Sequence, residues 1–258
     1  MKDIKVLLVQ LDIAWQQPEK NKSKIEKILV GQPQVDLIVL PEMFTTGFTM
    51  ETDTMSEPHE GPTFLWMQQL AKSKNSVVTG SLIINHQGKM LNRLYWVQPD
   101  GKSIVYDKRH LFRMAGEDEH FNEGHQKVYP IIKGWRVCPL ICYDLRFPVW
   151  SRNQNDFDLL LYIANWPEAR RHAWKTLSCA RAIENLTPVI ALNRVGTDGK
   201  HISYSGDSAI FNAKGEIIAE GLDKKEQVIF GEIKAKEYRA FRDKFPAHLD
   251  ADHFSIQL

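Results

Sequence analysis

The sequence predicts an α/β fold, because segments typical of strands alternate with segments typical of helices along the whole chain. Two apolar segments, 36–41 and 158–163, resemble each other, and a helical segment precedes each of them. This resemblance suggests two related α/β halves that face one another. The length of 258 residues suits one large α/β domain or two small ones. No linker divides the chain, so we expect a single domain over residues 1–258.

The first half begins with a strand-like segment and a helix that has Pro18 near its start and Gly31 as a stop signal. The elements expected there are a strand at 4–12, a helix at 18–30, a strand at 36–40, a helix at 61–74, and strands at 77–85, 90–97 and 102–107. His-Gln-Gly and Pro-Asp-Gly turns join the last three strands. Residues 108–126 have no clear period and predict a long loop, which in a compact domain is usually functional.

The second half repeats the alternation. The elements expected there are a strand at 135–142, a short helix at 146–155, a strand at 158–165, a helix at 170–186, strands at 188–194, 208–211, 216–220 and 228–233, and a helix at 234–244. The helix at 170–186 is the clearest of these, because Trp174, Leu177 and Ala180 share one face. A hairpin turn at 212–215 joins two of the late strands.

Composition excludes several classes of protein. The net charge is +1, from 33 Lys and Arg against 32 Asp and Glu, and no basic run is dense enough for a nucleic-acid partner. The apolar run near the N-terminus is too short for a signal peptide, and no segment approaches 18 apolar residues, so we expect no membrane partner. Three cysteines without export signals predict free thiols in the reducing cytoplasm.

Three short motifs each place a reactive side chain at or just after the end of an apolar strand. They are Leu-Pro-Glu at 40–42, Tyr-Asp-Lys-Arg-His-Leu-Phe at 106–112, and Leu-Ile-Cys-Tyr-Asp-Leu-Arg-Phe-Pro at 140–148. Strand carboxyl ends are where open α/β sheets present reactive groups. Glu42 can take the thiol proton of Cys142, the thiolate can attack a carbonyl, and Lys108 can hold the oxyanion. The motifs therefore predict a cysteine hydrolase that uses no histidine.

Each residue also has a common structural explanation. A buried cysteine is usually a small core residue, a loop glutamate is often solvated, and a lysine after a strand commonly lies on the surface. Cys138 and Cys179 fit the core explanation, and no cysteine or histidine group has zinc-ligand spacing. A glycine-flanked nucleophile elbow does not fit, because Leu140 and Asp144 stand two residues either side of Cys142. Two histidines, His110 and His172, are interpreted as structural or rim residues.

The three ordered motifs, together with Ala-Arg-Ala-Ile-Glu-Asn at 180–185, resemble the nitrilase (carbon–nitrogen hydrolase) superfamily over essentially the whole chain. The resemblance implies a four-layer αββα sandwich, and homodimers that pack through the helices at 146–155 and 170–186. It also implies a second catalytic glutamate in the loop after Lys108. The distance from Gly124 places this residue at Glu117, with Glu119 as the rival. No metal ion and no organic cofactor are implied.

Within the superfamily, Asp-Lys-Arg-His-Leu-Phe-Arg-Met at 107–114 and Ala-Asn-Trp-Pro at 164–167 resemble the bacterial omega-amidase branch. The resemblance implies a small-molecule substrate, the terminal amide of 2-oxo acids such as 2-oxoglutaramate and 2-oxosuccinamate. The carboxylate at the far end of such a substrate needs a fixed cation, and the planar fork of arginine suits it. The candidates are Arg113, Arg146, Arg170 and Arg171, of which Arg146 is nearest in sequence to Cys142. The candidate pocket walls are Phe44, Phe48, Tyr143 and Trp166.

Four alternatives remain open on sequence grounds. A nitrilase, an N-carbamoyl amidase or a general aliphatic amidase would share Glu42, Lys108 and Cys142 and differ only in the pocket. A catalytically silent binding protein on the same sandwich would keep the fold without the activity. The preferred length of the oxo acid, the identity of the carboxylate-binding arginine and assembly beyond a dimer are not determined by the sequence.

Overall fold

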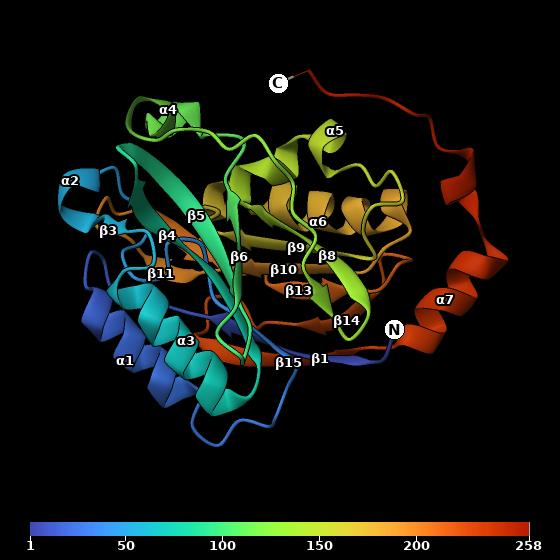
Figure 1. The fold of residues 1–258 in the computed structure, drawn as a ribbon, viewed down its shortest axis with the longest axis horizontal. Helices are drawn as coiled ribbons and strands as arrows, with labels where there is room; N and C mark the ends of the chain where they lie inside the picture. The colour runs from blue at the N-terminus through green and yellow to red at the C-terminus, as the bar shows by residue number, and fades with distance from the viewer. Residues whose placement is uncertain (258) are drawn as a thin grey trace.

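The computed structural model describes residues 1–257, which form two sheets packed face to face with helices on their outer faces (Figure 1). The first sheet has the strand order β15-β1-β2-β4-β5-β6, with β3 paired to β4. Its strands are β1 (Ile4–Gln10), β2 (Leu37–Val39), β3 (Glu57–Pro58), β4 (Val77–His86), β5 (Lys89–Val97), β6 (Ser103–Asp107) and β15 (Gln227–Ile233). Helices α1 (Pro18–Ile28) and α3 (Pro62–Lys74) cover its outer face (Figure 1).

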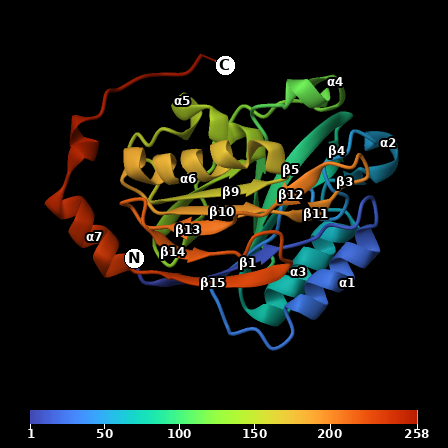
Figure 2. The same cartoon turned by 180° about the vertical axis from the view of Figure 1, so that it is seen from behind.

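The second sheet has the strand order β14-β13-β10-β9-β8-β7. Its strands are β7 (Ile131–Ile132), β8 (Trp135–Ile141), β9 (Leu159–Ala164), β10 (Val189–Asn193), β13 (Ala209–Phe211) and β14 (Ile217–Glu220). Helix α6 (Arg171–Asn185) lies along the outer face of this sheet (Figure 2). The chain ends with α7 (Ala235–Lys244) and a short 3₁₀ turn at Ala247–Asp250.

Alternation along β1 explains how one strand serves two layers. Ile4, Val6 and Leu8 pack into the core between the sheets, whereas Leu7 and Val9 pack under α1 and α3. Successive side chains of a strand point to opposite faces, so a strand buried on both faces is apolar throughout. The predicted four-layer αββα sandwich is therefore confirmed.

The two echoing segments occupy equivalent places. Strand β2 runs parallel to both β1 and β4, and β9 runs parallel to both β8 and β10. In each sheet, antiparallel strands extend the parallel centre on both sides. This common topology accounts for the similarity of 36–41 and 158–163 and fits two pseudo-symmetric halves.

The structure differs from the expected elements in several places. The helix expected at 146–155 is only α5 (Pro148–Ser151), because Asn153 turns the chain: its Oδ1 accepts the N–H of Asp156 and its Nδ2 donates to the carbonyl of Phe157. The loop expected at 108–126 contains a 3₁₀ turn at Arg113–Ala115 and α4 (Glu117–His120). The elements that were missed are α2 (Thr52–Met55), β3, β7, and the separate pair β11 (Val195–Thr197) and β12 (Ser203–Ser205). Within residues 1–257, none of the helices combines the length and apolarity needed to cross a bilayer.

Candidate active site

Cys142 lies at the point where β8 changes into a 3₁₀ turn that spans Cys142–Arg146. Its φ of +47° is a left-handed conformation that non-glycine residues seldom adopt. The carboxylate of Asp144 stabilises this turn, because its Oδ2 accepts the N–H of Ile141 at 3.0 Å. The sharp turn ends the strand at Cys142 and leaves its thiol beside a pocket.

Glu42 follows β2 and is completely buried, at 0% exposure. Its Oε1 accepts hydrogen bonds from Lys108 Nζ and Asn92 Nδ2, each at 2.9 Å, and its Oε2 accepts the backbone N–H of Asn165 at 2.7 Å. The Asn165 side chain also donates to the Glu42 carbonyl at 2.6 Å. These contacts fix both carboxylate oxygens of Glu42 in one orientation.

Lys108 directly follows β6 and is also fully buried. Its Nζ lies 2.9 Å from Glu42 Oε1 and 2.8 Å from Glu117 Oε2, so two carboxylates hold one ammonium. Burial acts to lower the pKa of Lys108, but Glu117 and Glu42 outweigh it and raise that pKa above its ordinary value. Lys108 therefore stays a cation that can stabilise a developing negative charge.

Glu117, at the start of α4, is the glutamate that reaches Lys108. Its carboxylate also accepts the backbone N–H of Phe112 at 2.6 Å, whereas Glu119 is exposed. Burial raises the pKa of Glu117, and the adjacent Lys108 opposes that rise. Of the two glutamates that the sequence offered, only Glu117 shares the buried cluster.

Burial, together with the nearby carboxylate of Glu42, raises the pKa of the Cys142 thiol well above its ordinary value, although Lys108 acts in the opposite direction. The resting side chain is therefore a neutral thiol that needs a base. Glu42 is the carboxylate that acts most strongly on it. The cluster can thus move a proton from sulfur to carboxylate beside a fixed cation.

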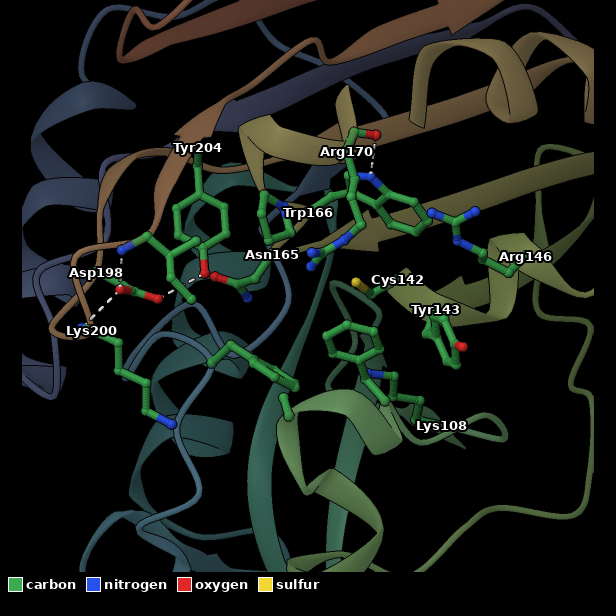
Figure 3. A pocket seen from close by; sticks show the side chains of 15 residues that line it. Lys108, Cys142, Tyr143, Arg146, Asn165, Trp166, Arg170, Asp198, Lys200 and Tyr204 are labelled. Atoms are coloured by element: carbon green, nitrogen blue, oxygen red, sulfur yellow. Dashed lines mark hydrogen bonds between the residues drawn. The ribbon is translucent and has the colours of Figure 1, made fainter. Parts of the chain in front are cut away.

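A pocket opens beside Cys142 and Lys108 (Figure 3). Of the expected substrate-contacting residues, Tyr143, Trp166, Arg146 and Phe48 line this pocket. Phe44 does not: its side chain is fully buried in the core beneath the first sheet, with its ring centroid 5.9 Å from that of Trp66. The choice of Phe44 as a pocket wall is corrected to Phe48, whose ring lies under Lys108 Nζ at 5.1 Å.

Two of the four candidate arginines reach the pocket. The Arg146 guanidinium lies 5.1 Å from the ring centroid of Trp166, and that of Arg170 lies 5.1 Å from the ring centroid of Phe112. Arg113 instead pairs with Asp118 on the surface, and Arg171 pairs with Asp207 and Asp223. Arg113 and Arg171 therefore do not line the pocket.

A fourth pocket cation, Lys200, and its loop were missed by sequence reasoning. Asp198, Lys200 and Ile202 line the pocket from the connection between β11 and β12, and Tyr204 lines it from β12. Asp198 shapes this loop: its Oδ1 accepts the N–H groups of Lys200 and Ile202, and its Oδ2 accepts the Tyr204 hydroxyl. The dipeptide Asp198-Gly199 is a hairpin signal that could have located the loop.

The remaining candidates have structural positions. His110 stacks on Phe147 with ring centroids 3.7 Å apart and contacts Asp144 through Nδ1, while His172 is exposed on α6. Cys138 is buried in the core between the sheets, and Cys179 lies partly buried on α6. Among residues 1–257, no group of three or more His, Cys, Asp or Glu side chains is arranged to hold a metal ion.

The sequence profile of carbon–nitrogen hydrolases matches residues 5–243. The chain belongs to the carbon–nitrogen hydrolase family. This hydrolase is 44% identical over 256 residues to the Omega-amidase YafV of Escherichia coli (strain K12), covering 99% of this chain and 100% of that protein. It is 31% identical over 248 residues to the 2-oxoglutaramate amidase of Bacillus subtilis (strain 168), covering 94% and 95% of the two chains. These relatives confirm the resemblance to the omega-amidase branch.

Solved structures agree with this membership. The hydrolase superposes on XC1258 from Xanthomonas campestris with a TM-score of 0.96, 42% identity and complete coverage of both chains. That protein is described as a CN-hydrolase superfamily member with an arsenic adduct in its active site. Nit3 of Saccharomyces cerevisiae, from branch 10 of the nitrilase superfamily, has a TM-score of 0.83 at 24% identity and covers 95% of each chain, which shows the shared fold.

Proposed function

We propose that the chain is an omega-amidase, which hydrolyses the terminal amide of 2-oxo dicarboxylic acid monoamides such as 2-oxoglutaramate and 2-oxosuccinamate. The products are the 2-oxo acid and ammonia. The observation that carries the proposal is a single pocket in which Cys142 and Lys108 lie together with the guanidinium of Arg146. The names of the two relatives above support the same substrate class.

Acylation begins at the thiol. Glu42 takes the proton of Cys142, and the thiolate forms a bond to the amide carbon. The side chain of Lys108, with the backbone N–H of Tyr143, stabilises the tetrahedral oxyanion. Glu42 then returns the proton to nitrogen, the carbon–nitrogen bond breaks, and ammonia leaves a thioester on Cys142. This step uses only the Cys142 thiol, the Glu42 carboxylate and the substrate amide.

Deacylation repeats the sequence with water. Glu42 takes a proton from the water that attacks the thioester carbon, the same cation holds the second oxyanion, and the carbon–sulfur bond breaks. The proton returns to the sulfur atom, which restores the neutral thiol that burial favours. Glu117 orients Lys108 through the ion pair at 2.8 Å. Neither a metal ion nor an organic cofactor has a role in this scheme.

The carboxylate of the substrate is assigned to Arg146. This arginine lies on the face of Trp166, and its guanidinium makes no ion pair with any of residues 1–257, so its N–H donors are available. Tyr143 and Trp166 are proposed as apolar walls for the methylene carbons. Arg146→Met should raise KM for 2-oxoglutaramate and leave KM for an uncharged amide unchanged.

Ammonia release tests the proposal directly. The purified protein and Cys142→Ala would be compared on 2-oxoglutaramate, 2-oxosuccinamate, glutamine, asparagine, a simple nitrile and an N-carbamoyl amino acid. We expect fast turnover of the oxo-acid amides by the wild type alone. Activity confined to the nitrile or to the carbamoyl substrate would replace the omega-amidase assignment with one of the alternatives in the same family, and activity retained by Cys142→Ala would remove Cys142 from the mechanism.

We also propose that residues 1–258 form one domain and that the protein is a homodimer that acts in the cytoplasm. The core between the sheets draws side chains from both halves of the chain, which supports one folding unit. Val149 on α5 and Ile183 on α6 are 56% and 52% exposed, and an interface would bury this apolar surface. Ile183→Glu should shift the mass measured by light scattering from two chains to one. The three free thiols suit a reducing compartment.

A further inference from the structure

Two arginines in the pocket have guanidinium groups without protein acceptors. Among residues 1–257, no carboxylate pairs with Arg146 or Arg170, and no side-chain hydrogen bond ends on either guanidinium. Aromatic faces hold both groups instead, each at 5.1 Å. Two cations that are positioned against aromatic rings but unpaired indicate a ligand that offers two separate acceptor groups.

Trp166 connects the two arginines. The Arg146 guanidinium lies over its ring, and its Nε1 donates to the backbone carbonyl of Arg170 at 2.9 Å. Figure 3 shows the Arg170 side chain pointing into the pocket toward Cys142, whereas Arg146 lies at the outer side, past Trp166. Arg170 is half-buried and Arg146 is exposed, which agrees with an inner and an outer position.

We infer that Arg170 binds the 2-oxo group of the substrate and selects 2-oxo acid amides against the corresponding 2-amino acids. This inference rests on the proposed omega-amidase function. In a 2-oxo acid amide the ketone carbon lies one carbon nearer to the amide than the carboxylate does, so the inner guanidinium meets the ketone while Arg146 meets the carboxylate. The ketone oxygen accepts hydrogen bonds, and a guanidinium has only donors.

The placement of Arg170 against the 2-position of the substrate also disfavours glutamine as a substrate. Its 2-position carries an ammonium, which cannot accept a hydrogen bond and would lie against the like charge of Arg170. Sites that are built to bond a polar group discriminate strongly against an analogue that cannot form the bond, and like charges in close contact add repulsion. The Phe112 ring, 5.1 Å from the Arg170 guanidinium, favours the discrimination by holding that cation in place.

Steady-state kinetics on three amides test this role. The substrates are 2-oxoglutaramate, glutaramate (the same carboxylate without the 2-oxo group) and glutamine. Because a hydrogen bond to a charged group is lost, Arg170→Met should lower kcat/KM for 2-oxoglutaramate by at least about tenfold and change that for glutaramate by less than about threefold. The ratio of kcat/KM for 2-oxoglutaramate to kcat/KM for glutamine should fall in Arg170→Met as well. Arg170→Lys, which keeps the charge but loses the planar fork, should fall between Arg170→Met and the wild type.

Matched variants separate this role from others. Arg146→Met should lower kcat/KM for 2-oxoglutaramate and glutaramate alike, because both carry the carboxylate. Arg113→Met, on the surface beside Asp118, should change neither. An equal loss on both substrates in Arg170→Met, or no loss on either, would overturn the role of Arg170. A wild-type enzyme that turned over 2-oxoglutaramate no faster than an uncharged amide would overturn the proposed function itself, whatever the variants do.

Discussion

The Tyr106 hydroxyl donates to Asp144 Oδ2 at 2.7 Å, and this bond joins two of the three motifs. Tyr106 lies in β6, two residues before Lys108, and Asp144 lies two residues after Cys142. The other oxygen of Asp144 accepts the backbone N–H of His110 at 3.0 Å. One buried carboxylate thus fixes the distance between the segment that carries Lys108 and the turn that carries Cys142.

Removal of this carboxylate should destabilise the protein more than removal of its phenolic partner. Asp144→Ala leaves the N–H groups of Ile141 and His110 and the hydroxyl of Tyr106 without their acceptor, and we expect a loss of about 3–5 kcal/mol in unfolding free energy. Tyr106→Phe removes one donor to Asp144 and leaves the Trp150 Nε1–H without its acceptor, and should cost about 1–3 kcal/mol. Urea unfolding followed by circular dichroism measures both. Equal losses would mean that Asp144 contributes nothing beyond the Tyr106 bond.

The two neighbouring glutamates of α4 offer a matched pair for catalysis. Glu117→Gln removes a charge that holds Lys108, so the cation shifts from its position and kcat should fall about 100-fold. Glu119→Gln alters an exposed side chain of the same helix and should leave kcat unchanged. Steady-state kinetics and thermal unfolding of both variants check this expectation. A loss of activity in Glu119→Gln as large as that in Glu117→Gln would contradict the assignment of Glu117 as the second glutamate of the site.

The resting thiol of Cys142 should be protonated at neutral pH. Burial and the Glu42 carboxylate raise its pKa in the folded state, so a thiolate absorbance near 240 nm, taken as wild type minus Cys142→Ala, should be absent from pH 6 to about pH 9. The raised folded pKa also favours folding below the ordinary thiol pKa, and this contribution is lost as pH rises toward the folded value. A difference band that titrates near pH 7 would instead indicate a preformed thiolate.

The loop between β11 and β12 should control substrate binding more than turnover. Asp198→Ala removes the acceptor for the N–H groups of Lys200 and Ile202, so the pocket wall loosens, and we expect KM to rise about tenfold while kcat changes little. Asn212 is a suitable control, because its Oδ1 accepts the N–H groups of Lys214 and Glu216 in a turn that does not line the pocket. Kinetics of Asn212→Ala should match the wild type. A KM that rises equally in both variants would attribute the effect to general loosening.

The sequence predicted those features that depend on local pattern. Strand-end placement located Glu42, Lys108 and Cys142, because a buried strand must be apolar and the residue after it can face solvent or a pocket. The echo of two apolar strands anticipated their equivalent places in the two sheets. The second glutamate came from the resemblance to the family, which with the distance from Gly124 favoured Glu117 over Glu119, and the structure places Glu117 against Lys108.

Features that depend on contacts between distant segments were not predictable in the same way. Asn165 holds Glu42 from 123 residues away, and nothing local marks an asparagine after a strand for that role. Phe44 and Phe48 are alike in sequence context, and only packing in three dimensions sends one into the core and the other to the pocket. The helix expected at 146–155 was shortened by side-chain bonds of Asn153, which helical periodicity does not report.

The two sheets contribute different halves of the chemistry. Glu42 and Lys108 follow strands of the first sheet, while Cys142 and Asn165 follow strands of the second. Neither half of the chain therefore carries the whole cluster. A small slip of one sheet across the other would separate the Glu42 carboxylate from the Cys142 sulfur while every helix and strand stayed intact. Ammonia release thus reports the alignment of the two layers, and under gradual heating it should disappear before the circular dichroism signal of the helices does.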